Sequence, residues 1–364
     1  MKVRLGQFGQ FVNVGSPIVG GGEGSICPND FSDSLLFKLF HRPSLQKEKK
    51  ILAMLDHPPK IACRVHRALR VTWPLEILYD PKGNFVGYAM ARVPNAIKLF
   101  DIYHRSRVST AKDRDIVLNL AYDICEIIDS LHQDGIMIGD INESNILVAQ
   151  KHVTFIDTDS FQIRGNGEIY RCEVGRPEFM ARETIGRPRR DFNVLPEHDN
   201  HALNVLLFLL FMNGVHPYHA GWTGKGPKPS LAERIQKGMW PYGRRGKAMQ
   251  VRPPRSAPSF TDLPAGFCDL FSRCFEMGHF RPTKRPQASD WMKEIALVKS
   301  RNLQGIATGS KSTLNVWPHS KASTPNPLRR LVHALMTPVL VPLKLTLSVL
   351  LNLGTKLQRQ LGER

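Results

Sequence analysis

The sequence predicts an α+β fold of two lobes, a small β-rich lobe followed by a larger helical lobe, with a tail at the C-terminal end. Short apolar runs alternate with turns up to about residue 93, as in the run 34–40 (Ser-Leu-Leu-Phe-Lys-Leu-Phe), and this alternation is typical of strands. Beyond residue 113 the apolar residues follow helical periodicity, and the run 202–212 is almost wholly apolar. A helix that is apolar on every side is typical of the centre of a large lobe.

Each lobe contains elements that the pattern predicts one by one. In the small lobe we expect strands over 34–40 and 87–93, the second after the turn 80–84 (Asp-Pro-Lys-Gly-Asn). Between them, the run 45–55 predicts a helix whose apolar residues share one face, and the following Asp-His-Pro ends it. In the large lobe the run 116–131 predicts an amphipathic helix before the apolar one.

The chain divides into four predicted segments. The small lobe is expected over residues 1–93 and the large lobe over residues 94–299. Residues 300–330 are rich in Ser, Thr, Pro and basic side chains, which predicts a linker. In residues 331–364 leucines recur at spacings of three and four among basic residues, which predicts an amphipathic helical tail.

Three interpretations of this tail remain open. The helix could dock on the large lobe or on an acidic partner protein. Its basic side chains, including Lys344 and Arg359, would also suit an anionic membrane surface. A transmembrane span is the least favoured of the three, because Pro338, Pro342 and Lys344 interrupt the apolar run.

The composition limits the class of protein. With 42% hydrophobic residues, the 364-residue chain can bury a core, which excludes disorder throughout. Its 50 basic and 32 acidic residues give a formal charge of +18, so acidic protein segments, anionic lipid and nucleic acid are candidate partners, with nucleic acid not favoured. The six cysteines lack zinc-binding spacing, which indicates reduced thiols. The first residues lack the apolar run of a signal peptide, so we expect a cytoplasmic location, with the tail as a candidate attachment to the inner face of the membrane.

A glycine-rich segment lies near the N-terminus, in residues 18–26 (Ile-Val-Gly-Gly-Gly-Glu-Gly-Ser-Ile). Glycines leave the backbone amides free to approach phosphate oxygens without obstruction by side chains. An ordinary glycine-rich turn would look the same, so the segment is weak evidence alone. It does not match the G-x-x-x-x-G-K-[ST] pattern, which disfavours a P-loop NTPase.

A lysine and a glutamate follow this segment in order. Lys38 is the lone charge inside an apolar strand, where burial is costly without a partner. Glu48 comes ten residues later, inside the predicted helix 45–55. Taken singly, they are typical of an edge strand and of a solvated helix face. Together with the glycines they form an ordered set of loop, strand lysine and helix glutamate.

Two polar segments of the large lobe contain candidate catalytic residues. The first, 136–148, contains Asp140 and Asn145, and the second, 153–161, contains Asp157. These groups suit phosphoryl transfer, because one carboxylate can orient a hydroxyl while an amide and a second carboxylate hold magnesium against phosphates. An Asx-rich turn beside a β-hairpin would explain each piece but not the ordered set.

This ordered set resembles the protein kinase superfamily, with Gly-Asp-Ile-Asn-Glu-Ser-Asn as catalytic loop and Asp-Thr-Asp as metal-binding motif. The resemblance implies ATP in the cleft between the lobes, with Mg²⁺ or Mn²⁺, and transfer of the γ-phosphoryl group to Ser or Thr hydroxyls of a protein. Lys38, held by Glu48, would grip the phosphates, and Asp140 would orient the hydroxyl. Asn145 and Asp157 would bind the metal.

The resemblance implies further contacts with ATP. The expected ATP-binding residues are Gly20, Gly21, Gly22, Gly24, Ile26, Lys38, Met90, Arg92 and Val93. Met90 occupies the gatekeeper position, and Arg92 and Val93 belong to the hinge that would bind adenine.

Three structural positions match as well, and the resemblance spans about residues 12–299. Glu183 lies in an Ala-Arg-Glu segment at the position of the A-P-E motif, where it would pair with Arg285. Asp199 opens the apolar helix at the position from which kinases brace the catalytic loop.

Several positions depart from the family pattern. The replacements are Val19 for the first glycine, Ile138-Gly139 for His-Arg, Asn142 for lysine, Thr158-Asp159 for Phe-Gly, and Arg182 for proline. The missing arginine predicts activity that does not depend on activation-loop phosphorylation, and the missing phenylalanine removes its hydrophobic switch. Asn142, which we count with the catalytic residues, retains a hydrogen-bond donor, so we expect slow catalysis.

The variant motifs resemble those of divergent bacterial eukaryotic-like Ser/Thr kinases, some of which carry helix-hairpin-helix DNA-binding modules. No such hairpin motif is found in this sequence. Two other hypotheses remain: a pseudokinase scaffold that binds nucleotide or a partner, and a nucleic-acid-associated regulator that uses the positive charge.

Overall fold

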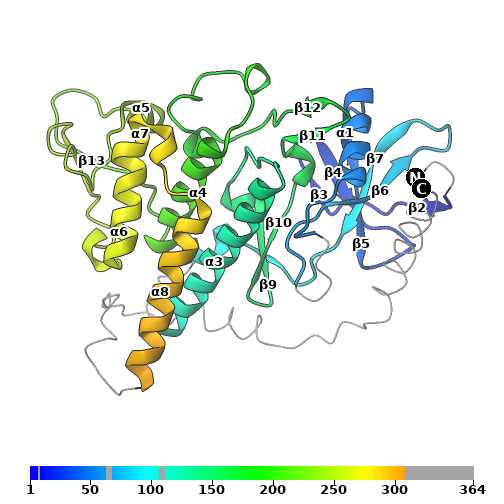
Figure 1. Ribbon diagram of the computed structural model, residues 1–364. Helices are drawn as coiled ribbons and strands as arrows, with labels where there is room; N and C mark the ends of the chain where they lie inside the picture. Colours follow the sequence, from blue (N-terminus) through cyan, green and yellow to red (C-terminus); the bar gives the residue numbers. More distant parts are fainter. Residues whose placement is uncertain (7–8, 63–67, 106–110, 308–364) are drawn as a thin grey trace. The chain divides into compact units, whose positions relative to one another are not determined.

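The computed structural model describes residues 1–6, 9–62, 68–105 and 111–307 (Figure 1). In this part of the chain a mixed α/β fold combines one large antiparallel sheet with a set of helices, and the sheet has seven strands in the order β2-β1-β6-β7-β5-β4-β3. The strands are β1 (Lys2–Leu5), β2 (Phe11–Asn13), β3 (Val19–Gly20), β4 (Gly24–Cys27), β5 (Leu35–Phe40), β6 (Pro74–Tyr79) and β7 (Phe85–Ala91). The predicted strands 34–40 and 87–93 are thus confirmed as β5 and β7, with ends shifted by one or two residues.

Two glycines let the central strands approach closely around Lys38. A Cβ atom at Gly87 in β7 would lie 1.9 Å from the carbonyl oxygen of Lys38 in β5. A Cβ at Gly24 in β4 would lie 2.5 Å from the carbonyl oxygen of Leu39. Both contacts are with backbone, which cannot move aside cheaply, so the sheet requires glycine at both positions.

Helix α1 (Leu45–Asp56) packs on β6 and β7 of this sheet, and it confirms the helix predicted over 45–55. Ser44 caps its N-terminus, with its hydroxyl accepting the amide of Lys47 at 3.3 Å. Two prolines follow His57 and prevent the helix from continuing. The indole of Trp73 donates to the carbonyl of Met54 at 2.8 Å and fixes the buried face.

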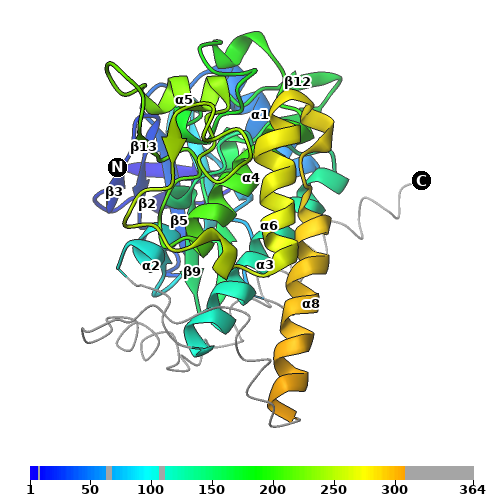
Figure 2. The same ribbon diagram turned by 90° about the vertical axis from the view of Figure 1, so that its left-hand side faces the viewer.

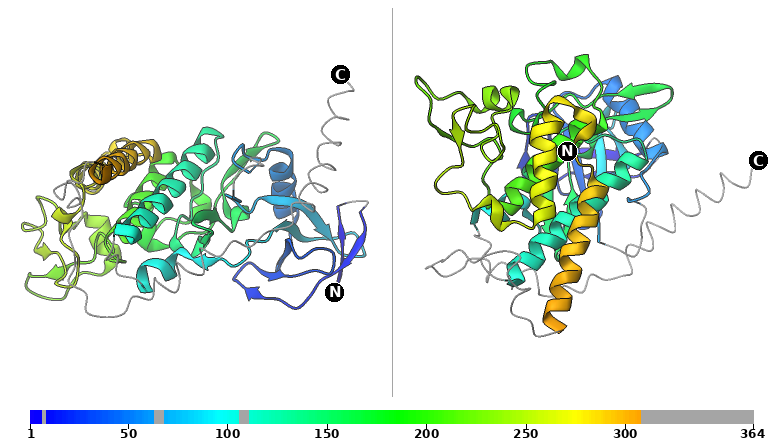
Figure 3. Two further views of the ribbon diagram at one scale, coloured as in Figure 1. Left: turned by 90° about the horizontal axis from the view of Figure 1, so that it is seen from below. Right: turned by 60° about the vertical axis from the view of Figure 1, so that its left-hand side comes forward.

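Seven further helices of the described chain follow. They are α2 (Leu99–Arg105), α3 (Ala111–Gln133), α4 (Pro196–Phe211), α5 (Leu231–Lys237), α6 (Ala265–Ser272), α7 (Gly278–Phe280) and α8 (Ala288–Ala307). Helix α3 contains the predicted run 116–131 and lies alongside α8 (Figures 1, 2 and 3). Helix α4 contains most of the predicted run 202–212 but begins earlier, because Pro196 supplies a preformed first turn.

Seven short strands form the smaller sheets of the described chain. They are β8 (Ile97–Lys98), β9 (Ile146–Ala149), β10 (His152–Phe155), β11 (Ile163–Gly165), β12 (Glu168–Tyr170), β13 (Gly221–Trp222) and β14 (Val251–Arg252). Strands β8, β9 and β10 form one sheet, while β11 pairs with β12 and β13 pairs with β14. The β9–β10 hairpin separates the two polar segments that the sequence singles out.

The buried helix α4 organises an aromatic core. The ring centroid of Phe271 lies 5.0 Å from that of Phe208 and 4.7 Å from that of Trp291. Asn204, fully buried on α4, accepts the indole N–H of Trp291 at 3.1 Å and donates to the carbonyl of Pro286 at 3.0 Å. These bonds attach α4 to the start of α8 and satisfy a polar group in an apolar surrounding.

The end of the described chain differs from the prediction. Helix α8 continues to Ala307, past residue 300, because no proline occurs before Pro318. The rest of the predicted linker and the whole predicted tail, 331–364, lie outside the described residues. Among the helices described, none has both the length and the apolar character that a membrane span needs. Five of the six cysteines are described, and all five are free thiols.

The close approach of β5 and β7 gives the first testable prediction. Replacing Gly87 with alanine forces a methyl group against the backbone at Lys38, so we expect the free energy of unfolding to fall by about 1–3 kcal/mol. Urea denaturation measures the change. Gly22→Ala is the matched control, because a Cβ there meets no atom within 4 Å. Equal stability of the two variants would contradict the packing described here.

Candidate active site

The segment that precedes β9 is held by a buried aspartate of α4. The carboxylate of Asp199 accepts the backbone amides of Ile138 at 2.7 Å and Gly139 at 2.8 Å. Gly139 has a φ of +75°, and a Cβ there would lie 2.6 Å from the sulfur of Cys172. The position therefore requires glycine in this structure.

Asp140 and Asn145 lie side by side in this segment. The amide nitrogen of Asn145 donates to Oδ2 of Asp140 at 3.0 Å and to its carbonyl at 3.2 Å. The other carboxylate oxygen of Asp140, Oδ1, is buried and has no hydrogen-bond partner among the described residues. Asp140 thus keeps one carboxylate oxygen whose acceptor capacity no described residue uses.

The side chain of Asn142 forms hydrogen bonds within its own loop. Its side-chain oxygen accepts the amide of Ser144 at 3.0 Å and caps a short 3₁₀ turn, Glu143–Asn145. Its side-chain nitrogen donates to the carbonyl of Asp140 at 3.1 Å. The residue is 1% exposed, and its donor is engaged inside the loop.

The Asp-Thr-Asp turn after β10 is fixed by hydrogen bonds. Asp157 adopts a left-handed conformation with φ of 62°, and its carbonyl accepts the hydroxyl of Ser160 at 2.8 Å. Thr158, fully buried, donates its hydroxyl to the carbonyl of Thr72 at 3.0 Å. A polar anchor therefore occupies the place that the family gives to a mobile phenylalanine.

Lys38 makes its ion pairs with this turn. Its ammonium lies 2.5 Å from Oδ1 of Asp157 and 2.7 and 2.8 Å from the two carboxylate oxygens of Asp159. The hydroxyl of Tyr88 donates to the same Asp159 at 2.7 Å. Lys38 is 5% exposed and Asp159 is 7% exposed, so this pair is almost entirely removed from water, whereas the Asp157 side chain is 37% exposed.

The pKa values of the cluster reflect this balance. Burial alone would lower the pKa of Lys38, but the two carboxylates outweigh burial and raise it, so the side chain stays cationic. Burial would raise the pKa of Asp159, but its bonds to Lys38 and Tyr88 lower it instead. For Asp157 burial prevails over Lys38, and the pKa is raised.

The predicted pairing of Lys38 with Glu48 is wrong for this structure. Glu48 accepts the hydroxyl of Tyr79 at 2.9 Å, and burial together with this bond raises the pKa of Tyr79 to about 12. The α1 face next to Asp159 instead presents Lys47 and Lys50. A helix presents different faces at successive positions, so Glu48 turns toward β6 while its neighbours turn toward the Asp-Thr-Asp turn.

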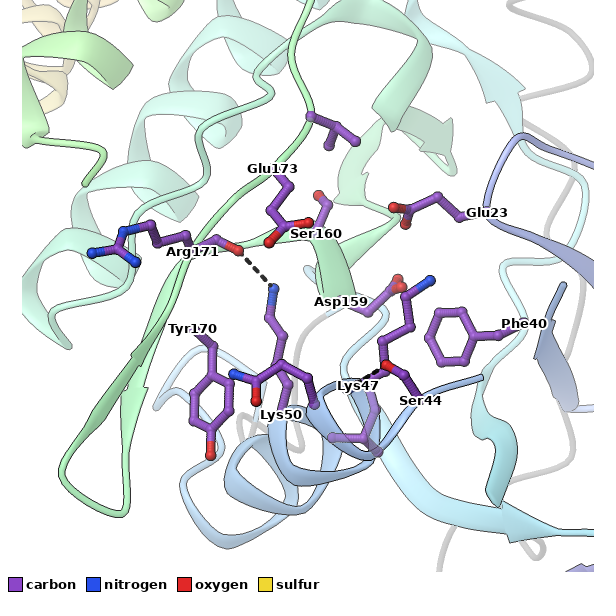
Figure 4. A pocket seen from close by; sticks show the side chains of 13 residues that line it. Glu23, Phe40, Ser44, Lys47, Lys50, Asp159, Ser160, Tyr170, Arg171 and Glu173 are labelled. Atoms are coloured by element: carbon purple, nitrogen blue, oxygen red, sulfur yellow. Dashed lines mark hydrogen bonds between the residues drawn. The ribbon is translucent and has the colours of Figure 1, made fainter. Parts of the chain in front are cut away.

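Lys47 and Lys50 line a cavity of about 210 Å³ beside Asp159 (Figure 4). Lys50 extends past Tyr170 toward the carbonyl of Arg171, to which it donates at 3.4 Å. Burial lowers the pKa of Lys50, and nearby acidic groups including Asp159 oppose that shift. The cavity therefore places a second positive charge close to the acidic turn.

The expected ATP-binding residues lie on β3, β4, β5 and β7 and in the segments that follow β3 and β7. A Cβ at Gly20 or Gly22 would meet no atom within 4 Å, so packing does not require glycine there. Gly24 is required by the sheet itself. Ile26 lies opposite Lys38 in the β4–β5 pair.

The gatekeeper and hinge positions follow at the end of β7. Met90 is 8% exposed and pairs with Leu36 of β5. The amide of Arg92 donates to the carbonyl of Ser34 at 2.8 Å, so that group is already bonded inside the protein. Of the two hinge residues expected to bind adenine, Val93 is the one whose amide forms no such bond within the described chain.

Glu183 and Arg285 form a two-pronged ion pair. The two guanidinium nitrogens of Arg285 lie 2.6 and 2.8 Å from the two carboxylate oxygens of Glu183. Arg285 also donates to the carbonyls of Gly278 and Glu197, both at 2.9 Å. Burial would raise the pKa of Glu183, but Arg285 more than offsets this and lowers it.

Sequence reasoning missed two residues of this site. The sequence does not indicate that Asp159 pairs with a lysine, and it does not single out Arg189. Arg189 donates to the carbonyl of Gly139, and its guanidinium packs on Gly175 of the segment before Glu183. The basic run 187–190, next to a catalytic loop without its own arginine, is the signal that could have found it.

Two comparisons with known proteins bear on the class of this protein. No protein-family model matches the chain. Among curated proteins it is similar to Protein kinase YegI of Escherichia coli O157:H7, with 27% identity over 317 residues. The chain is kinase-like. That match covers 85% of this chain and 48% of the relative, and Protein kinase YegI of Escherichia coli K12 is 26% identical over 87% of this chain and 49% of its own length. The kinase-like chain thus spans about half the length of the curated relatives it matches.

The ion pair of the kinase-like chain gives a prediction with a pH dependence. Arg285 lowers the pKa of Glu183 in the folded protein. The pair therefore stabilises the fold fully above about pH 4.3, the ordinary glutamate pKa. This stabilisation is lost as the pH falls through the lower pKa of the folded state. Glu183→Gln should lower the free energy of unfolding by somewhat less than the about 3–5 kcal/mol that breaking a fully buried ion pair costs. Urea unfolding at pH 7 and near pH 3 measures it, and a difference that does not shrink in acid would contradict the assignment.

Proposed function

We propose that this chain is an ATP-dependent protein kinase that transfers the γ-phosphoryl group to Ser or Thr hydroxyls of a protein substrate. The observation that supports it most is the convergence of four functional side chains from distant parts of the sequence. Lys38 contacts Asp157 at 2.5 Å, and Asn145 contacts Asp140 at 3.0 Å. The two pairs are linked through the backbone, because the carbonyl of Asn145 accepts the amide of Ile156, the residue before Asp157, at 3.0 Å. In this proposal the sheet with α1 forms the small lobe, the other helices form the large lobe, and ATP binds between them.

The residues divide the reaction among them. The carboxylate of Asp140, whose Oδ1 has no partner among the described residues, accepts the proton of the substrate hydroxyl as the hydroxyl oxygen bonds to the γ-phosphorus. The bond from that phosphorus to the bridging oxygen breaks, and ADP leaves. Lys38 balances the charge of the α- and β-phosphates, while the backbone of residues 20–22 covers them. Asp199 and Arg189 keep the loop of Asp140 in place.

Asn145 and Asp157 are the residues that would hold Mg²⁺ or Mn²⁺. The amide of Asn145 gives its nitrogen to Asp140 and so directs its oxygen elsewhere, and the Asp157 side chain is 37% exposed. Both offer oxygen ligands, which magnesium prefers. No cluster of three or more His, Cys, Asp or Glu side chains forms a metal site in the described residues, so nucleotide phosphates and water would complete the coordination. The ion would supply charge neutralisation at the phosphates.

Slow turnover follows from the side chain at position 142. Kinases place a lysine there, and this chain has a buried asparagine whose donor is engaged in the loop. One missing donor to a developing anion costs about 3 kcal/mol of transition-state stabilisation. The same observation supports the second candidate function, a scaffold that binds nucleotide or a partner without transferring phosphate.

Autophosphorylation with γ-labelled ATP and Mg²⁺ tests the proposal. The wild-type chain should incorporate label on Ser or Thr, while Lys38→Ala and Asp140→Ala should incorporate none above background. Asp33→Asn is the matched control, because this exposed carboxylate lies outside the site. Absence of label in the wild type, with ATP still bound, would contradict the kinase proposal and support the scaffold.

A second experiment tests the independence from activation-loop phosphorylation. Arg189 already anchors the catalytic loop through the carbonyl of Gly139. In this proposal the loop therefore does not need a phosphorylated residue to hold it in place. We expect the chain to phosphorylate an added protein substrate at an unchanged initial rate after exhaustive phosphatase treatment. Loss of all activity on dephosphorylation, and its return on rephosphorylation, would refute this expectation.

A further inference from the structure

The geometry points to Asp159 as the positioning residue that aims Lys38 at the phosphates of ATP, the part that the sequence assigns to Glu48. The inference rests on the proposed kinase function and adds a residue to it. It makes the Asp-Thr-Asp turn responsible for two tasks, since one aspartate faces the metal position and the other holds the lysine.

The first argument is the difference between the two aspartates. Asp159 meets Lys38 with both carboxylate oxygens, at 2.7 and 2.8 Å, whereas Asp157 meets it with one. The Asp159 side chain is 4% exposed and the Asp157 side chain 37%. A two-oxygen contact inside the protein fixes the direction of an ammonium group better than one contact at its edge. Asp157 remains at the accessible side of the turn.

The second argument is that Asp159 is itself held in place. Tyr88, fully buried on β7, donates its hydroxyl to Asp159 at 2.7 Å. Tyr88 lies directly opposite Lys38 in the β5–β7 pair. Two neighbouring strands thus present a cation and a hydroxyl to the same carboxylate, and Thr158 anchors the turn that carries it through the carbonyl of Thr72.

The third argument is the charge on α1. Glu48 is engaged by Tyr79, and the face of α1 near the turn presents Lys47 and Lys50 (Figure 4). A helix whose face carries two lysines cannot neutralise Lys38. The partner of Lys38 therefore belongs to the rigid turn, and a displacement of α1 would not release the lysine.

Acylation of Lys38 by an N-hydroxysuccinimide ester, followed by peptide mass spectrometry, tests the inference without requiring phosphoryl transfer. Asp159→Asn removes the charge with little change of shape, and we expect Lys38 to be acylated several-fold faster, because its amine is then released from the ionised carboxylate that makes two of its three contacts. Tyr88→Phe should also increase the acylation rate of Lys38, but by less. Because this variant removes no charge, it serves as the test if Asp159→Asn fails to fold. Glu48→Gln is the matched control and should leave the acylation rate of Lys38 unchanged.

Kinetics supply a second readout. In Asp159→Asn the KM for ATP should rise about tenfold and by more than kcat falls, because the lysine contacts the phosphates before and during transfer. An unchanged acylation rate of Lys38 in both Asp159→Asn and Tyr88→Phe would overturn the inference, as would a larger increase in Glu48→Gln. Neither outcome would count against the kinase proposal, which depends on turnover by the wild type. Absence of turnover in the wild type would instead overturn the kinase proposal on which the inference rests.

Discussion

The buried charge of Lys38 is the constraint on which the rest of the site depends. An ammonium group inside a protein costs several kcal/mol of solvation unless carboxylates and hydrogen bonds replace the water. Here two aspartates of one turn supply the negative charge, and Tyr88 fixes the better-buried one. The close β5–β7 approach at Gly87 and the bond of Thr158 to Thr72 bring the two halves of this cluster to the same place.

A second set of polar anchors fixes the loop that carries Asp140. Asp199 holds two successive backbone amides from helix α4, and Arg189 holds the carbonyl of Gly139 from the other side. Arg285 ties Glu183 to the same helix through the carbonyl of Glu197. The loop is thus fixed by groups within the described chain, without an arginine at position 139.

Much of this arrangement could be predicted from the sequence, because short motifs in a fixed order identify their own positions. The order of lysine, aspartate, asparagine and aspartate places Lys38, Asp140, Asn145 and Asp157, and strand β5 and helix α1 follow from local periodicity. The lysine's partner could not be predicted in the same way. Periodicity shows which residues of a helix share a face, but only tertiary packing decides which face meets the turn, and here that face carries lysines rather than Glu48. Arg189 was missed for a similar reason, since its contact with Gly139 crosses 50 residues of sequence.

The most direct test of the central claim is a double-mutant cycle on the free energy of unfolding, made with Lys38→Met, Asp159→Asn and the double variant. If the buried pair organises the site, the coupling free energy between Lys38 and Asp159 should be about 2 kcal/mol or more. A parallel cycle between Lys38 and Glu48 should give a coupling below about 0.5 kcal/mol. A Lys38–Glu48 coupling equal to or larger than that of Lys38 with Asp159 would contradict the account.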